Sequence, residues 1–146
     1  MRVLLDTNIL ARAATGPPGL ANELVLAATH HEHVLLLSPF LVSELSRVLR
    51  YDRVRAIHRL NDDGINQYVS DLIAVAEIVI PAEEAETVAI VPDDPDDDPV
   101  VAAAIAGKAD ALCTKDKHLL QRAVVSYCVS HGIEVINDVS LLNRLR

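Results

Sequence analysis

The residues Arg2-Val3-Leu4-Leu5-Asp6 decide the expected fold, because an apolar run of strand length ends there directly at a carboxylate. A similar run, Ala111-Leu112-Cys113-Thr114, is followed after one residue by Asp116. Further short apolar runs cover Val34 to Leu37, Ile78 to Ile80 and Ile133 to Ile136. Runs of this length without polar alternation are typical of buried parallel strands.

Segments with helical spacing of apolar residues separate these strands. The clearest one, from Ile65 to Ala76, has the pattern of an amphipathic helix. Ser38-Pro39 predicts a helix start, with a capping hydroxyl followed by proline at the first helical position. Gly107 predicts the end of a helix of small residues. The other expected helices run from Leu20 to Ala28, from Pro39 to about Arg50, from Val100 to Ala106, and over most of Lys117 to His131.

Length and composition fit one domain. The chain has 146 residues, of which 51% are apolar, enough for one full core but a tight fit for two. Aromatic residues make up only 3%, so the core is expected to be aliphatic. Strands that alternate with helices predict a parallel sheet covered on both faces. We therefore expect a single domain over residues 1–146, of class α/β, with three layers α/β/α and a central, mostly parallel sheet of four to five strands.

Charge and hydropathy restrict the possible functions. The chain carries 13 Lys and Arg against 21 Asp and Glu, a net charge of -8, which argues against wholesale phosphate binding. No apolar run approaches the roughly 18 residues of a membrane span. The opening run meets Asp6 too early for a signal peptide, so we expect a cytoplasmic protein. Cys113 and Cys128 lie in apolar stretches without metal-ligand spacing and are expected to be buried.

Acidic residues recur where a parallel sheet would gather a ligand. Ligands of open α/β sheets bind beyond the carboxyl ends of the strands. Asp6 and Asp116 follow two of the predicted strands. Asp97 and Asp98 stand at the mouth of a helix, and Glu44 lies between apolar neighbours in the helix after the second strand. We expect these carboxylates to converge.

Taken singly, the same residues have plainer interpretations. Asp98 precedes a proline and could cap a helix, and Asp116 could cap the helix after it. Asp6-Thr7-Asn8 could be a turn, Glu44 a solvated residue, and the aspartate run an acidic loop. Four acidic positions at one edge favour a divalent metal site, because clustered carboxylates repel one another unless a cation lies among them. Oxygen ligands suit Mg²⁺ or Mn²⁺, which supports phosphate-ester chemistry.

Four segments together resemble a PIN-domain nuclease, in particular the toxin-like branch related to VapC toxins. The segments that carry this resemblance are Leu4-Leu5-Asp6-Thr7-Asn8-Ile9-Leu10, Ser43-Glu44-Leu45, Asp94-Pro95-Asp96-Asp97-Asp98-Pro99, and Ala109 to Leu120 with its Thr114-Lys115-Asp116 motif. They keep their order over nearly the whole chain.

The resemblance implies a metal-dependent endoribonuclease that hydrolyses single-stranded RNA and leaves a 5′-phosphate. The acidic quartet that would hold Mg²⁺ or Mn²⁺ falls on Asp6, Glu44, Asp97 or Asp98, and Asp116. Asn8 and Thr114 match polar positions that support the site. Lys115 and His118 depart from the usual pattern, which leaves the acids intact but puts the substrate preference in doubt.

Basic side chains gather just past Glu44, at Arg47, Arg50, Arg53, Arg55, His58 and Arg59. Arg47, Arg50 and Arg53 are the expected contacts to RNA phosphates. The same patch could dock an acidic antitoxin segment or form a solvated helical face. His30, His31 and His33 lack companion ligands and are expected at the surface rather than in a zinc site.

The resemblance further implies a cognate antitoxin as partner, allows a homodimer, and involves no membrane. One alternative is a catalytically silent PIN-like module that binds RNA or protein. Another is an RNA-maturation nuclease that has no antitoxin. A phosphoacceptor receiver domain is disfavoured, because it needs a pair of acids after the first strand and gives Glu44 no role.

Overall fold

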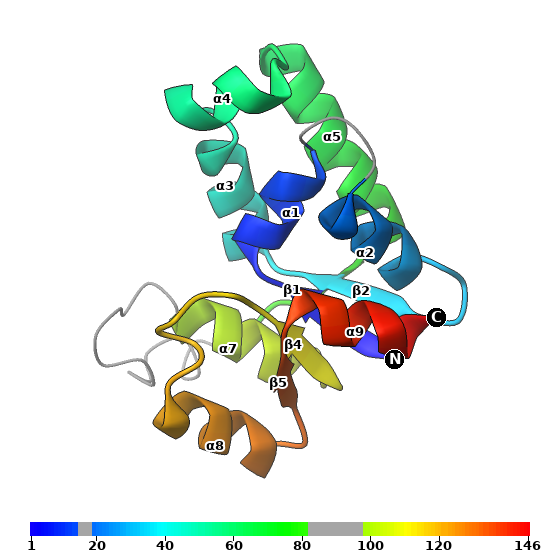
Figure 1. Cartoon of the computed structure of the whole chain (residues 1–146), viewed down its shortest axis with the longest axis vertical. Helices are drawn as coiled ribbons and strands as arrows, with labels where there is room; N and C mark the ends of the chain where they lie inside the picture. Colours follow the sequence, from blue (N-terminus) through cyan, green and yellow to red (C-terminus); the bar gives the residue numbers. More distant parts are fainter. Residues whose placement is uncertain (15–18, 82–97) are drawn as a thin grey trace.

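The computed structural model describes residues 1–14, 19–81 and 98–146, together with the backbone but not the side chain of Asp98. Its five strands are β1 Arg2–Leu5, β2 Val34–Leu37, β3 Glu77–Ile78, β4 Ala111–Cys113 and β5 Glu134–Ile136. They form one sheet in the order β3-β2-β1-β4-β5, and every neighbouring pair is parallel. The prediction of a central parallel sheet is confirmed (Figure 1).

Helices connect the strands and cover the sheet. The described helices are α1 Thr7–Ala13, α2 Leu20–Ala28, α3 Pro39–Val48, α4 Asp52–His58, α5 Asp62–Val75, α7 Asp98–Ala106, α8 Arg122–Ser130 and α9 Asp138–Leu145. No helix among the described residues is long and apolar enough to cross a membrane.

β1 lies at the centre of the sheet because its side chains are apolar on both faces. Leu4 pairs with Leu36 of β2 and with Leu112 of β4, so three leucines stand side by side. Val3 and Leu5 point to the opposite face, because side chains alternate along a strand. All of these residues are buried, as expected for a parallel sheet covered by helices on both sides.

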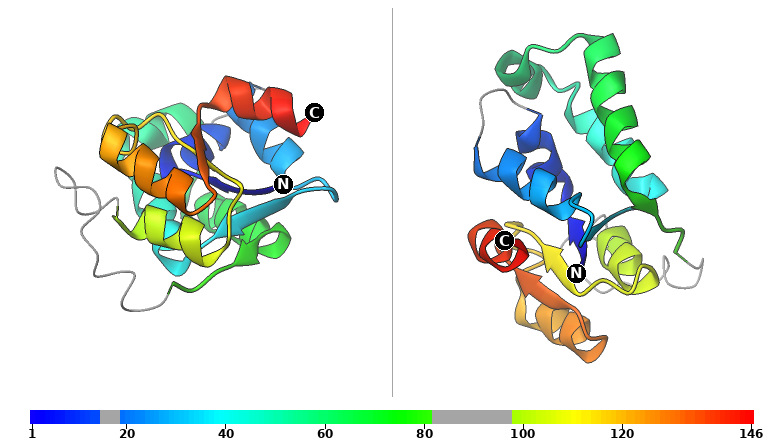
Figure 2. Two further views of the ribbon diagram at one scale, coloured as in Figure 1. Left: turned by 90° about the horizontal axis from the view of Figure 1, so that it is seen from below. Right: turned by 90° about the vertical axis from the view of Figure 1, so that its right-hand side faces the viewer.

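The two faces of the sheet carry two separate apolar clusters. One cluster contains Val3 and Leu5 of β1 together with residues of α1, α2, α3, α5 and α9. The other contains Leu4 together with residues of α7 and α8, and includes Leu41 of α3. Figure 2 shows these two groups of helices on opposite sides of the sheet. The predicted three-layer α/β/α arrangement is therefore confirmed.

Several local predictions can be compared with the structure. Ser38 caps α3 as expected, and its Oγ accepts the Leu41 N–H at 3.2 Å. The expected helix over most of Lys117 to His131 is confirmed, although α8 begins only at Arg122. The chain instead turns after Asp116, whose carbonyl oxygen accepts the N–H groups of Leu119 and Leu120. Helices α1, α4 and α9 were not expected from the sequence.

The parallel sheet brings four strand ends to one edge. β1, β2, β4 and β5 are followed directly by Asp6, Ser38, Thr114 and Asn137. Leu5 pairs with Cys113, and Cys113 pairs with Ile136, so the ends of β1, β4 and β5 lie level with one another. Residues that follow these strands are therefore neighbours in space.

Candidate active site

Asp6 lies at the junction between β1 and α1. Its N–H donates to the Cys113 carbonyl at 3.0 Å, which extends the pairing of β1 with β4 by one residue. Its Oδ1 accepts the Thr7 N–H at 2.7 Å, so the carboxylate caps α1. Asp6 is only 4% exposed. The carboxylate is thus held in a fixed orientation beneath the surface of this edge.

Thr114 joins Asp6 to Asp116. Its hydroxyl donates to Asp6 Oδ2 at 2.8 Å and accepts the Asp116 N–H at 2.9 Å. Thr114 is fully buried, and Asp116 is half-buried at the start of the following turn. Asp116 Oδ1 in turn accepts the His118 N–H at 2.8 Å. One hydroxyl therefore fixes the relative position of two acidic residues that lie far apart in the sequence.

Burial is the main influence on the pKa of Asp6 and raises it above its ordinary value. The hydrogen bonds from Thr114 and Thr7 oppose this shift, whereas the negative charge of Asp116 adds to it. No Lys or Arg forms an ion pair with Asp6 in the described part of the chain. A cation placed between Asp6 and Asp116 would relieve both the burial cost and the mutual repulsion.

The structure brings only some of the predicted acids together. Asp6 and Asp116 are joined through Thr114, whereas Glu44 is a half-buried residue of α3. Asp97 lies outside the described residues, and Asp98 is the first residue of α7. Across residues 1–14, 19–81 and 99–146, no three His, Cys, Asp or Glu side chains are close enough to share a metal ion. The third acid predicted by the sequence falls in or beside the segment that is not described.

Two buried polar atoms adjoin this pair of acids. Thr7 Oγ1 and His118 Nδ1 have no hydrogen-bond partner among the described residues. Thr7 is the residue after Asp6, and the His118 backbone binds Asp116. Buried polar groups normally have a partner, and a metal ion with its waters would supply oxygen partners at this edge. The donor set, carboxylate and hydroxyl oxygen, fits Mg²⁺ or Mn²⁺.

Sequence reasoning missed a second buried carboxylate at the same edge. Asp138 is the first residue of α9 and is 2% exposed. Its Oδ2 lies 3.1 Å from Lys115 Nζ and 3.7 Å from Arg12 Nη2, and its Oδ1 accepts the Val139 N–H at 2.9 Å. The available signal was its place two residues after β5, which matches the strand-end rule that singled out Asp6.

The thiol of Cys113 lies near the charged groups of Asp6, Asp138, Arg12 and Lys115. Burial, with a smaller contribution from the carboxylates of Asp138 and Asp6, raises the pKa of Cys113 to about 12. The cations Arg12 and Lys115 act in the opposite direction. One thiol at the end of β4 is therefore within electrostatic range of both buried carboxylates and both cations. The prediction that Cys113 is a buried, free cysteine is confirmed.

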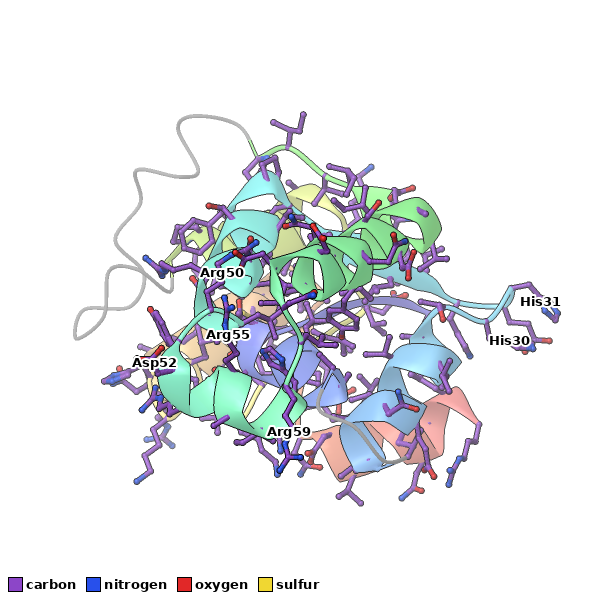
Figure 3. All side chains as sticks on the ribbon, turned by 90° about the horizontal axis from the view of Figure 1, so that it is seen from above. His30, His31, Arg50, Asp52, Arg55 and Arg59 are labelled. Carbon is purple, nitrogen blue, oxygen red and sulfur yellow. The ribbon has the colours of Figure 1, made fainter. Side chains whose placement is uncertain are left out.

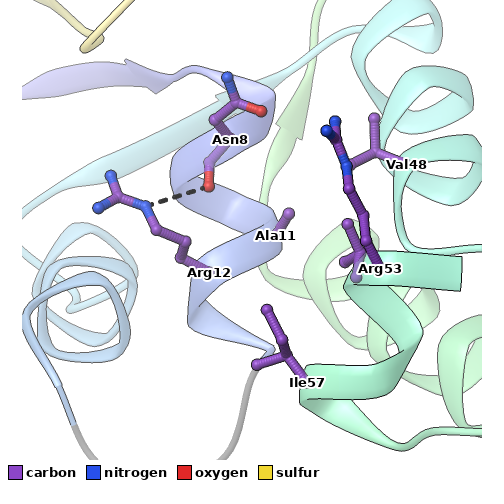
Figure 4. A pocket seen from close by; sticks show the side chains of 7 residues that line it. Asn8, Ala11, Arg12, Val48, Arg53 and Ile57 are labelled. Atoms are coloured by element: carbon purple, nitrogen blue, oxygen red, sulfur yellow. Dashed lines mark hydrogen bonds between the residues drawn. The ribbon is translucent and has the colours of Figure 1, made fainter. Parts of the chain in front are cut away.

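A pocket opens beside this edge between α1 and the facing helices α3 and α4 (Figure 4). Its volume is about 240 Å³, and its lining residues are Asn8, Ala11, Arg12, Val48, Arg53, Val54 and Ile57. Asn8, predicted as a polar support of the acids, is an exposed residue of α1 at this pocket. Arg12 connects the pocket to Asp138.

The basic cluster past Glu44 is only partly directed to solvent. Arg50 hydrogen-bonds to Ser46 and Asn66 and lies 3.4 Å from Asp62, and Arg55 binds the same carboxylate at 2.8 Å. Figure 3 shows Arg50 and Arg55 close together between α3, α4 and α5, far from His30 and His31.

The remaining side chains of that cluster differ in exposure. Arg47 and Arg53 are exposed, whereas His58 is buried, and its Nε2 lies 2.7 Å from the Leu49 carbonyl oxygen. Arg53 also lines the pocket. His30 and His31 are exposed, as predicted.

Comparison with known proteins agrees with this geometry. Residues 2–118 match the family model described as PIN domain. The chain therefore belongs to the PIN-domain family, whose members are generally nucleases and typically depend on divalent metals. Searches of curated proteins and of solved structures gave no significant match. Asp138 lies beyond the matched residues.

Proposed function

We propose that this protein is a metal-dependent endoribonuclease that hydrolyses phosphodiester bonds of single-stranded RNA. The observation that carries the proposal is the hydrogen-bonded unit of Asp6, Thr114 and Asp116 at the carboxyl edge of the sheet. Burial raises the pKa of Asp6, and Asp116 adds to this effect. These are the conditions under which carboxylates bind a divalent cation rather than remain unpaired.

In this proposal, Asp6 and Asp116 hold Mg²⁺ or Mn²⁺, and Glu44 with Asp97 or Asp98 completes the acidic set. The bound ion would activate water and offset the charge that develops on the phosphoryl oxygen. Groups of the protein itself orient these carboxylates. Thr114 keeps the two carboxylates in register, and the Thr7 N–H keeps Asp6 turned toward the edge.

The substrate and biological role extend the same proposal. Arg47 and Arg53 are exposed and are proposed to bind RNA phosphates, whereas Arg50 is already engaged with Asp62. We assign the protein to the toxin side of a toxin–antitoxin pair, on the basis of the sequence segments that resemble VapC toxins. A neighbouring gene for a small DNA-binding protein would support this role, and a neighbourhood of RNA-processing genes would favour RNA maturation.

The decisive experiment follows cleavage of a labelled single-stranded RNA by the wild type, Asp6→Asn and Asp116→Asn, with Mn²⁺ or with EDTA. Asp71→Asn is the matched control, because Asp71 is an exposed carboxylate of α5. Cleavage by the wild type and by the control, abolished by EDTA and by both site substitutions, is the expected result. Equal behaviour of all four folded proteins would overturn the nuclease and favour a silent RNA- or protein-binding module.

A further inference from the structure

The cation pair formed by Lys115 and Arg12 lies at the same edge as the acids but is not part of the acidic set. Lys115 stands between Thr114 and Asp116 in the turn after β4, and Arg12 lies in the last turn of α1. Both contact Oδ2 of Asp138. Three elements from distant parts of the sequence thus meet at one carboxylate oxygen.

Asp138 anchors these two cations. Its side chain is 3% exposed, and a charge removed from water to this degree is stable only when it is paired. Oδ1 is occupied by the Val139 N–H, which leaves Oδ2 for Lys115 and Arg12. The backbone bond fixes the carboxylate at the start of α9, and its Oδ2 gives both long side chains a common contact.

Both cations of this cluster are accessible from solvent. One carboxylate faces two cations, and the side chains of Lys115 and Arg12 are 53% and 46% exposed. Each cation therefore keeps about half of its side chain open to solvent while it contacts Asp138.

The cation pair lies close to the acids Asp6 and Asp116. Lys115 is the residue between Thr114 and Asp116, which are joined by a hydrogen bond, and Cys113 is within electrostatic range of Asp6, Asp138, Arg12 and Lys115. A nucleic-acid strand carries a phosphate on every nucleotide, so a phosphodiester bound at the acids has neighbours on both sides. Arg and Lys bind phosphate oxygens through charge-assisted hydrogen bonds.

We infer that Lys115 and Arg12 form a phosphate-binding subsite, anchored by Asp138, for a phosphodiester that flanks the one held at Asp6 and Asp116. This inference rests on the proposed nuclease function and names a substrate contact that the acidic motif does not include. Arg12 also lines the pocket between α1 and α4, so a strand bound at the cation pair continues along α1 past Asn8 (Figure 4).

The test measures binding of a fluorescent single-stranded RNA to the full chain in EDTA, over a range of salt concentrations. Each phosphate contact to a single strand contributes about 0.7 to the slope of log affinity against log salt. Lys115→Ala and Arg12→Ala should each reduce the slope by about 0.7 and weaken binding several-fold, whereas Lys115→Arg should restore both. Lys108→Ala is the control, because Lys108 is an exposed lysine before β4, at the opposite edge of the sheet.

The outcomes separate this inference from the proposed function. If the wild type neither binds nor cleaves RNA, the nuclease proposal fails and the subsite fails with it. If the wild type cleaves RNA but the salt slopes of Lys115→Ala and Arg12→Ala equal that of the wild type, only the subsite is overturned. In that case the two cations stabilise Asp138 without binding phosphate. Both alanine variants would then show a lower free energy of unfolding and an unchanged salt slope.

Discussion

Asp6 and Asp138 are two buried carboxylates at the same edge of one sheet, but their charges are compensated differently. Asp138 has two cations on one oxygen. Asp6 has a hydroxyl and a backbone N–H as hydrogen-bond donors, and the like charge of Asp116 raises its pKa. The fold thus neutralises one carboxylate internally and leaves the other in need of an external cation. This difference distinguishes a structural anchor from a candidate metal ligand.

Loss of cleavage is the largest effect that this comparison predicts. Asp6→Asn should lower RNA cleavage by more than about 100-fold, because loss of a ligand should exceed the roughly 10–100-fold cost of losing a ligand's partner. Asp138→Asn should reduce cleavage by less than about tenfold at saturating RNA. Single-turnover rates with labelled RNA measure both variants. A larger loss for Asp138→Asn than for Asp6→Asn would reverse the assigned roles.

The second prediction concerns the free energy of unfolding. Arg12→Ala combined with Lys115→Ala leaves the buried Asp138 charge unpaired and should cost about 3 kcal/mol or more at pH 7. Asp138→Asn keeps an oxygen for the Val139 N–H and leaves without a carboxylate only two cations that are half exposed to water. It should therefore lower the free energy of unfolding by about 1 kcal/mol. Urea unfolding measures both. Equal costs would show that Asp138 does not depend on its cations.

The bridging hydroxyl of Thr114 gives a third, smaller effect. Thr114→Val preserves the shape of the side chain but removes the bond to Asp6 and leaves the Asp116 N–H without its acceptor. We expect a loss of about 10–100-fold in activity or Mn²⁺ affinity, as for other residues that orient ligands. Thr114→Ser should recover most of the loss. Full activity of the valine variant would mean that the two acids are positioned independently.

The smallest predicted effect is a pH dependence. Burial raises the pKa of Asp6 above its ordinary value of 3.8, so its ionisation costs stability: the cost is absent below pH 3.8 and complete above the pKa in the folded chain. Without metal, Asp6→Asn should therefore raise the melting temperature at pH 7, and the gain should shrink as the pH falls toward 3.8. If Asp6→Asn melted below the wild type both at pH 7 and near pH 3.8, the inferred upward shift of the Asp6 pKa would be contradicted.

The sequence was sufficient to predict the site residues that follow closely after a strand. Asp6 ends an unbroken apolar run, and Thr114 and Asp116 follow another, so a parallel sheet had to bring them to one edge. Asp138 was missed because Asn137 separates it from β5 and because an acid at a helix start has an ordinary capping role. Its burial depends on ion pairs with Lys115 and Arg12, which come close to it only in the folded tertiary structure.

Local chemistry explains the errors in secondary structure. Thr7 and Asn8 favour turns, which hid α1, although Asp6 supplies the cap that begins this helix. After Asp116, hydrogen bonds to its carbonyl and carboxylate oxygens fold residues 117–120 into a turn before α8 can begin. In both cases a residue of the site, rather than helix propensity, sets the local conformation.

Calorimetric titration with Mn²⁺ tests most directly whether Asp6 is a metal ligand and Asp138 an internal anchor. The wild type and Asp138→Asn should bind Mn²⁺ with similar affinity, while Asp6→Asn and Asp116→Asn should show little or no binding. If Asp6→Asn binds as the wild type does, or if Asp138→Asn loses binding while Asp6→Asn keeps it, the external cation does not belong between Asp6 and Asp116.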